Sequence, residues 1–209
     1  YMIIIISIFS SCSGSFLDQK PYSSVSPEDA LASESDLLIA LRGVYADLWD
    51  ANLYVRTIPV DGDLYADNAY ISIKNSGKYL TFDNYTISSN DADFSGIWST
   101  SYNTILRANN LIDANVSPNT NVNQYKGEAY ALRALTYFNL IRIYARPYLA
   151  DSTGLGVPIV LHYDPAYKPA RSQTNQVYAR ILNDLDSARI LQTEYINSTR
   201  FSPYAATLL

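Results

Sequence analysis

Apolar residues recur at three- and four-residue steps along much of the chain, which is the spacing of one face of an α-helix. The first such stripe lies in residues 26–50, where Ser26 is the expected N-cap and Pro27 the first helical residue. Its apolar positions are Leu37, Leu41, Val44, Tyr45 and Leu48. The pattern predicts an amphipathic helix with one buried face.

The same spacing predicts further helices. Residues 93–115 carry the stripe Phe94, Trp98, Tyr102, Ile105, Asn109 and Ile112, and residues 122–148 are apolar over more than half of a helical circumference. A helix of the second kind must be buried between neighbours. Another is expected from about Thr174, with Val177, Ile181, Leu185 and Ala188 inward, and the pair Ser202-Pro203 repeats the helix-start signal.

Two segments do not follow the helical spacing. Residues 52–93 are rich in Asn, Asp, Ser and Gly and are expected to be irregular, with a short strand in KYLTFDNYTI. A second short strand is expected in VPIVL, residues 157–161. We therefore expect a mainly α fold of tetratricopeptide-like helical pairs with long loops, although no repeat of about 34 residues occurs.

The N-terminal pattern differs from the rest. Residues 2–9 form a short apolar run that is too short to span a bilayer but matches the core of a secretory signal. Small residues and the single cysteine, Cys12, come next, and this order resembles the lipobox of bacterial lipoproteins. We expect residues 1–11 to be a signal remnant and residues 12–25 a lipidated Cys12 with its tether. The alternative is an incidental cysteine beside a core strand.

Composition narrows the chemistry. With a net charge of −5 and scattered basic residues, the chain lacks the positive patch that nucleic acid requires, so no nucleic acid partner is expected. One His and one Cys give little for catalysis or metal binding, and no cofactor is expected. Asp61, Asp63 and Asp67 begin like a calcium loop but lack its glycine and final glutamate, which favours a solvated acidic loop.

Several strings, taken together and in order, resemble the SusD/RagB family of surface lipoproteins. They are the cysteine followed by FLD, the helix with W…Y..I..AN, the string GEAYALRALTYFNLIRIYARPY, and GVPIV…DP…KPARSQTNQVYARILNDLDSA. The resemblance covers Cys12 to Leu209. It implies a helical fold in residues 26–209, incomplete at its C-terminus, on the outer face of the outer membrane. It also implies oligosaccharide or peptide binding and delivery to a SusC-like TonB-dependent transporter.

Sugar binding needs aromatic faces and planar polar groups on loops held by a rigid frame. The irregular stretch offers both, and its candidate ligand contacts are Tyr65, Asp67, Asn68, Tyr70, Lys74, Tyr79 and Tyr85. Each of them can instead be plain loop packing. Trp98 is interpreted as core, and Glu128, Arg133 and Arg171 as structural groups that pair between packed elements.

The sequence thus predicts a lipid-anchored, cell-surface protein that binds oligosaccharide without catalysis. Two alternatives stay open: a helical-repeat scaffold for protein–protein interaction, and a surface glycoside hydrolase, since any two of the 20 acidic residues can meet in space.

Overall fold

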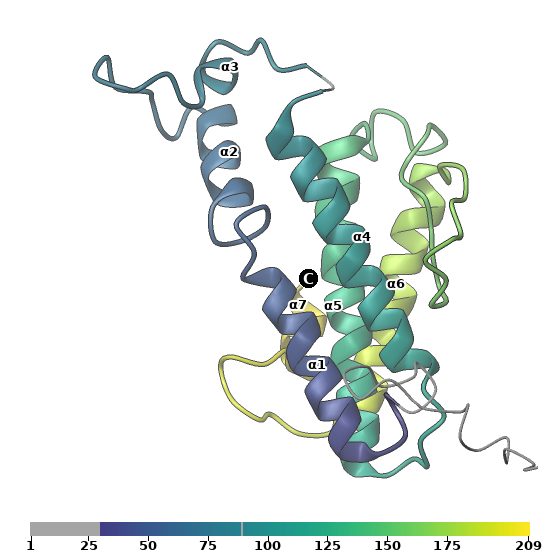
Figure 1. Ribbon diagram of the computed structural model, residues 1–209. Coiled ribbons are helices and arrows are strands. Elements are labelled where there is room, and N and C mark those ends of the chain that lie inside the picture. The colour runs from purple at the N-terminus through teal and green to yellow at the C-terminus, as the bar shows by residue number, and fades with distance from the viewer. Residues whose placement is uncertain (1–29, 89) are drawn as a thin grey trace, which may run out of the picture. The chain divides into compact units, whose positions relative to one another are not determined.

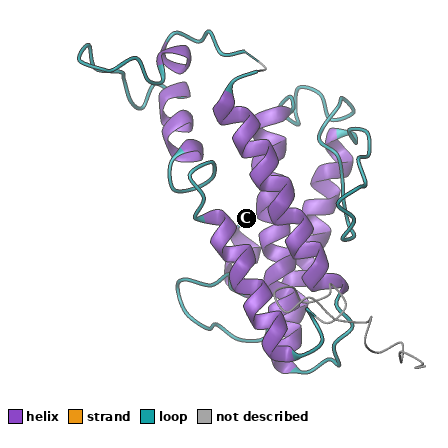
Figure 2. Cartoon of the chain, viewed as in Figure 1, coloured by secondary structure: helices purple, strands orange, loops and turns teal. Residues whose placement is uncertain are grey.

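A computed structural model describes residues 30–88 and 90–209, and these residues are almost entirely helix and loop (Figure 2). The helices are α1 (Glu34–Leu48), α2 (Thr57–Tyr65), α3 (Leu80–Asp83), α4 (Ala92–Asp113), α5 (Thr120–Tyr144), α6 (Thr174–Leu191) and α7 (Pro203–Leu208). Within the described ranges no helix is both long and apolar enough to cross a membrane. The mainly α prediction is confirmed.

Helix α5 is the centre of the fold, with α1, α4 and α6 packed around it (Figure 1). Its small residues make this possible: Ala129, Ala131 and Ala134 are completely buried. Gly127 lets the end of α6 approach so closely that an added Cβ would lie 2.8 Å from Cγ of Gln192. The prediction of a helix buried on all sides is therefore confirmed.

Two apolar clusters share α5. One lies between α1, α4 and α5 and includes Leu37, Leu41 and Val44 from the predicted stripe of α1. The other lies between α4, α5 and α6, where the segment around Val157 and Val160 closes it. Trp98 packs against this second cluster and is only partly buried. Its interpretation as a core residue is therefore confirmed only in part.

Buried charges tie the helices together. Arg133 on α5 is 3% exposed and makes a bidentate pair with Asp184 on α6, at 2.8 and 2.7 Å. Glu128, fully buried, accepts two hydrogen bonds from Arg200 and a third from the Tyr45 hydroxyl. These contacts confirm that Glu128 and Arg133 pair between packed elements.

Arg171 lies in the loop before α6 and joins it to the end of α5. Its guanidinium donates to the carbonyl oxygens of Gly156 and Tyr144. The predicted structural role of Arg171 is thus confirmed, and α6 begins at Thr174 as expected.

Three predicted features are wrong. Helix α1 begins at Glu34, not Pro27, because Ser33 caps it: Ser33 accepts from the N–H of Asp36, and the Asp36 carboxylate accepts from the N–H of Ser33. Ser26 itself lies outside the described residues. Neither expected strand forms, because in the described part of the chain no neighbouring strand is available to pair with it.

Helices replace the first of those strands and part of the expected irregular stretch. Residues 57–65 form α2, and Leu80–Asp83 of the predicted strand form the single turn α3, which buries Phe82. The segment 157–161 is loop, and an isolated antiparallel bridge between Leu155 and Gln173 lies just before it.

Candidate functional site

The predicted binding loop starts where helix α2 ends, and a tight reversal fixes its direction. After Tyr65, the last residue of α2, the backbone N–H groups of Asn68 and Ala69 both donate to the carbonyl of Asp63, at 2.9 and 3.3 Å. Within this reversal Asp67 has a φ of 55°. The loop is thus anchored to α2 by backbone hydrogen bonds at its first residues.

Backbone strain is concentrated in this region. Asp67, Tyr79 and Tyr85 have φ values of 55°, 60° and 53°, and no other non-glycine residue in the described part of the chain has a positive φ. Aspartate tolerates the left-handed region, but a bulky tyrosine there is an outlier that costs on the order of 1–3 kcal/mol. All three residues are among the predicted ligand contacts.

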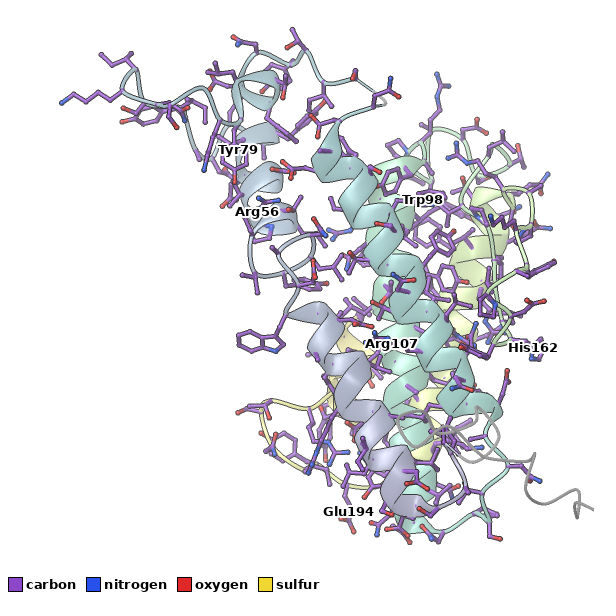
Figure 3. The ribbon with its side chains drawn as sticks, viewed as in Figure 1. Arg56, Tyr79, Trp98, Arg107, His162 and Glu194 are labelled. Atoms are coloured by element: carbon purple, nitrogen blue, oxygen red, sulfur yellow. The ribbon has the colours of Figure 1, made fainter. Side chains whose placement is uncertain are left out.

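Four aromatic residues pack together here, and we call them the tyrosine cluster: Tyr65, Tyr79, Phe82 and Tyr85. The Tyr65 ring meets Phe82 and Tyr85 edge to face, with centroids 6.3 and 5.5 Å apart, and Tyr79 meets Phe82 at 6.4 Å. Phe82 is buried, whereas Tyr65 and Tyr85 remain 49% and 53% exposed. The cluster therefore presents aromatic surface to solvent on a packed base. Figure 3 labels Tyr79, one of its members.

Asp67 belongs to the same surface. Its Oδ1 accepts a hydrogen bond of 2.7 Å from the Tyr85 hydroxyl, and this bond raises the pKa of the Tyr85 phenol. The bond holds one tyrosine ring and leaves the second carboxylate oxygen of Asp67 for other donors. Four of the seven predicted contacts, Tyr65, Asp67, Tyr79 and Tyr85, are thus brought together.

The other three are not. Tyr70 is 86% exposed, and Asn68 and Lys74 are also exposed. Among the described residues, no side-chain hydrogen bond joins any of the three to the tyrosine cluster. Cys12, the predicted lipidation site, lies outside the described residues.

A cavity of about 440 Å³ lies next to the cluster and shares Tyr65 and Phe82 with it. We call it the Asp61 cavity, because Asp61 lines it together with Phe94 and Arg142. Asp61 is only 7% exposed, and neither of its oxygens has a hydrogen-bond partner among the described residues. An unpaired buried carboxylate is costly, so this group requires an explanation.

The charges that act on Asp61 are of both signs. Asp93 and Asp91 stand at the start of α4, and Arg56, just before α2, pairs with Asp93 at 2.7 Å (Figure 3 labels Arg56). Burial first, and then Asp93 and Asp91, raise the pKa of Asp61 to about 7, while Arg56 acts in the opposite direction.

The sequence interpretation of the acidic stretch as a solvated loop is therefore wrong for Asp61, whereas Asp63 and Asp67 are exposed as expected. Asp61 and Asp63 lie on helix α2, and Asp61 points inward because it shares a helical face with Thr57 and Leu64, which are also buried. That spacing of three and four residues was the available signal. Within the described residues no group of three or more His, Cys, Asp or Glu side chains is arranged to hold a metal ion.

A second cleft, of about 450 Å³, lies between α4 and the loop before α6. Trp98, Tyr102, Tyr167 and Lys168 line it. The Tyr102 hydroxyl already donates to the carbonyl of Pro158, and the Trp98 ring packs against Tyr102 and Tyr144 with centroids 4.9 Å apart in both cases. Trp98 and Tyr102 are thus committed to packing.

Comparison with known proteins gives one consistent result. A SusD-like family model, described as "Starch-binding associating with outer membrane", matches residues 15–208. The chain is 28% identical to SusD-like protein P2 of Formosa agariphila, over 96% of this chain and 38% of that protein. It is also 28% identical to a SusD-like protein of Bacteroides ovatus, over 95% and 35%. The chain thus spans little more than a third of these relatives.

Solved structures agree with the sequence matches. A SusD superfamily protein from Bacteroides thetaiotaomicron has a TM-score of 0.73 and 28% identity, covering 84% of this chain and 40% of that one. One from Bacteroides vulgatus has a TM-score of 0.74 and 26% identity, covering 84% and 41%. Since the family model covers nearly the whole sequence and the same helices recur in these structures, the chain belongs to the SusD/RagB family.

Proposed function

We propose that this chain binds oligosaccharides at the outer face of the outer membrane and passes them to a SusC-like TonB-dependent transporter. The binding surface is the tyrosine cluster with Asp67. Capture is non-catalytic: the surface holds the ligand and leaves its glycosidic bonds intact.

The observation that carries this proposal is the strained, exposed aromatic surface itself. Tyr79 and Tyr85 are held in a costly backbone conformation, and such strain persists where a function depends on it. The exposed faces of Tyr65 and Tyr85 suit the apolar CH face of a sugar ring, and the free oxygen of Asp67 suits a hydroxyl group. The description of the matching family as starch-binding supports the same ligand class.

Membrane attachment and delivery are the remaining parts of the proposal. The order of residues around Cys12 supports a lipid anchor, and the family description supports association with the outer membrane. An anchored binding protein stays at a high effective concentration beside a transporter, so modest affinity for the ligand suffices. Fatty-acid labelling tests the anchor: the wild-type chain should become labelled and Cys12→Ser should not.

Binding is tested by titration calorimetry of the chain with neutral oligosaccharides, maltoheptaose first, then cellohexaose and xylohexaose. The double variant Tyr65→Ala, Tyr85→Ala should bind about tenfold more weakly or worse, because two stacking faces are removed. Tyr204→Ala is the matched control, since Tyr204 is 71% exposed on α7, outside the cluster. Equal affinity of all three proteins would refute the assignment of the surface.

The two alternatives make different predictions. A glycoside hydrolase would release reducing ends from the same oligosaccharides, whereas we expect none. A protein-binding scaffold would retain its partners without binding any of the sugars. Copurification with a TonB-dependent transporter after mild detergent extraction tests the delivery step.

A further inference from the structure

The Asp61 cavity contains a polar group that the fold does not use. Each buried polar side chain normally has a hydrogen-bond partner, and leaving a carboxylate unpaired is more costly than leaving a neutral group. Both oxygens of Asp61 are without a partner among the described residues, although the side chain is more than nine-tenths buried. Folding alone would be served better by an apolar residue here.

The rest of the lining has the character of a small-molecule site. Tyr65, Phe82 and Phe94 supply aromatic surface, and Arg142 adds a side chain with N–H donors to the same lining. The Arg142 guanidinium is held in place by a hydrogen bond of 2.8 Å to Asn139 and by stacking on Phe138 at 4.6 Å. The volume of about 440 Å³ lies in the lower part of the range for small-molecule sites, roughly 300–1,000 Å³.

The cavity is continuous with the tyrosine cluster, because Tyr65 and Phe82 belong to both. A chain of sugar units lying on the exposed faces of Tyr65 and Tyr85 would therefore reach the cavity with a neighbouring unit. We propose that the Asp61 cavity binds one neutral sugar unit of the captured oligosaccharide, and that both Asp61 oxygens accept hydrogen bonds from its hydroxyl groups. This inference rests on the proposed function and specifies its ligand.

The charged groups around the Asp61 cavity favour a neutral sugar over an anionic or cationic one. The charges that act on Asp61 are Asp93 on α4, Asp91 at the N-cap of α4 and Arg56 before α2, and Arg142 on α5 lines the same cavity. A uronate or sulfated unit beside Asp61 would meet that carboxylate in the lining and would lie close to Asp91 and Asp93, so it would be repelled; of these three only Asp93 has an ion-pair partner among the described residues. An ammonium group would meet the Arg142 guanidinium in the lining. A neutral unit avoids both conflicts and supplies the donors that Asp61 lacks.

A pH dependence follows. Burial, Asp93 and Asp91 raise the pKa of Asp61 to about 7, and Arg56 opposes the rise. Because the ionised carboxylate accepts two hydroxyl donors and the protonated one does not, ligand binding favours the ionised form. Affinity should then fall about tenfold as the pH decreases from about 8 to about 6.

The test uses the full chain and the neutral oligosaccharide that it binds most tightly in the panel above, titrated at several pH values. Asp61→Asn preserves shape but lacks the charge, so it should weaken binding about tenfold near pH 8 and abolish the pH dependence. Asp63→Asn, an exposed position on the same helix, is the matched control and should leave affinity and pH profile unchanged.

A second variant guards against effects on folding. A Cβ on Gly62 meets no atom within 4 Å, and Gly62 lines the cavity, so Gly62→Leu should fill the cavity without disturbing α2. We expect it to weaken neutral oligosaccharide binding while leaving the thermal unfolding midpoint unchanged or higher. Galacturonate oligomers should bind neither the wild type nor these variants.

The outcomes separate the two proposals. If Asp61→Asn and Gly62→Leu bind as tightly as the wild type while Tyr65→Ala, Tyr85→Ala does not, the cavity is not a subsite but the proposed function stands. Tight binding of galacturonate oligomers, or a wild-type affinity independent of pH, would equally overturn the subsite. If no neutral oligosaccharide binds the wild type, the proposed function fails and this inference fails with it.

Discussion

Replacing Arg133 by methionine perturbs the contact that links the most helices. The Arg133 guanidinium on α5 pairs with Asp184 on α6, donates to Oδ1 of Asn109 on α4 at 2.6 Å, and lies 3.4 Å from the carbonyl of Leu161. Methionine keeps the apolar stem but removes all of these bonds at once.

The expected magnitude follows from burial. Side chains of Arg133 and Asp184 are 3% and 0% exposed, and removing one partner of such a pair costs about 3–5 kcal/mol. Asp184 also pairs with Arg180 at 2.7 Å, which still neutralises it after Arg133 is gone. We therefore expect about 3 kcal/mol for Arg133→Met. Asp184→Asn should cost more, because it leaves two guanidinium groups without their carboxylate.

Urea unfolding followed by far-ultraviolet circular dichroism measures these losses. Arg107→Met is the matched control: Arg107 pairs with Asp47 at 2.7 Å but its side chain is 57% exposed, so the loss should be below about 1 kcal/mol. The double variant Arg133→Met, Asp184→Leu should lose less stability than Arg133→Met and Asp184→Leu added together, because an apolar pair replaces an ionic one, although Arg180 loses its carboxylate partner.

Two results would refute this reasoning. If Arg133→Met loses no more stability than Arg107→Met, burial does not determine the strength of these ion pairs. If the double variant loses as much stability as Arg133→Met and Asp184→Leu added together, the two residues are not coupled.

Three further predictions follow from other contacts. Gly127→Ala should destabilise the fold by about 1–3 kcal/mol despite the better helix propensity of alanine, because the new Cβ would lie 2.8 Å from Cγ of Gln192. In the same urea assay Gly43→Ala should stabilise the fold by about 0.5–1 kcal/mol, because its Cβ meets no atom within 4 Å. Tyr45→Phe should cost about 1–3 kcal/mol in chemical unfolding, because the hydroxyl both donates to Glu128 and accepts from the N–H of Phe201; an unchanged midpoint would contradict it. The pKa of Asp61 rises on folding from 3.8 to about 7, so the folded state binds the proton more tightly than the unfolded state. Relative to Asp61→Asn, the stability of the wild type should therefore fall by up to about 4 kcal/mol as the pH rises from about 4 to about 7, and then level off. Parallel curves of stability against pH for the two proteins would exclude this.

The helical core could be predicted from the sequence because its signals are local. The stripe Leu37, Leu41 and Val44 and the start of α6 at Thr174 both depend on residues within one or two turns. The start of α1 was misplaced for the same reason: two serine signals compete, and the reciprocal hydrogen bonds of Ser33 and Asp36 show which one caps the helix.

The site could be predicted only in part. Composition pointed to the loop, and four of its residues do meet, but the left-handed backbone at Tyr79 and Tyr85 has no sequence signal, since neither is glycine or asparagine. The sequence does not reveal the burial of Asp61, because this burial depends on α3 and α4 packing against α2. Contacts between distant segments are what a single sequence does not display.

The central claim is that oligosaccharide binds at the tyrosine cluster of α2 and α3. A crystal structure of the chain grown with its tightest neutral oligosaccharide tests this most directly. We predict sugar rings against Tyr65 and Tyr85, with one unit within hydrogen-bond distance of the Asp61 carboxylate. Sugar found in the cleft of Trp98 and Tyr167 instead, with Tyr65 and Tyr85 free of ligand, would contradict the account.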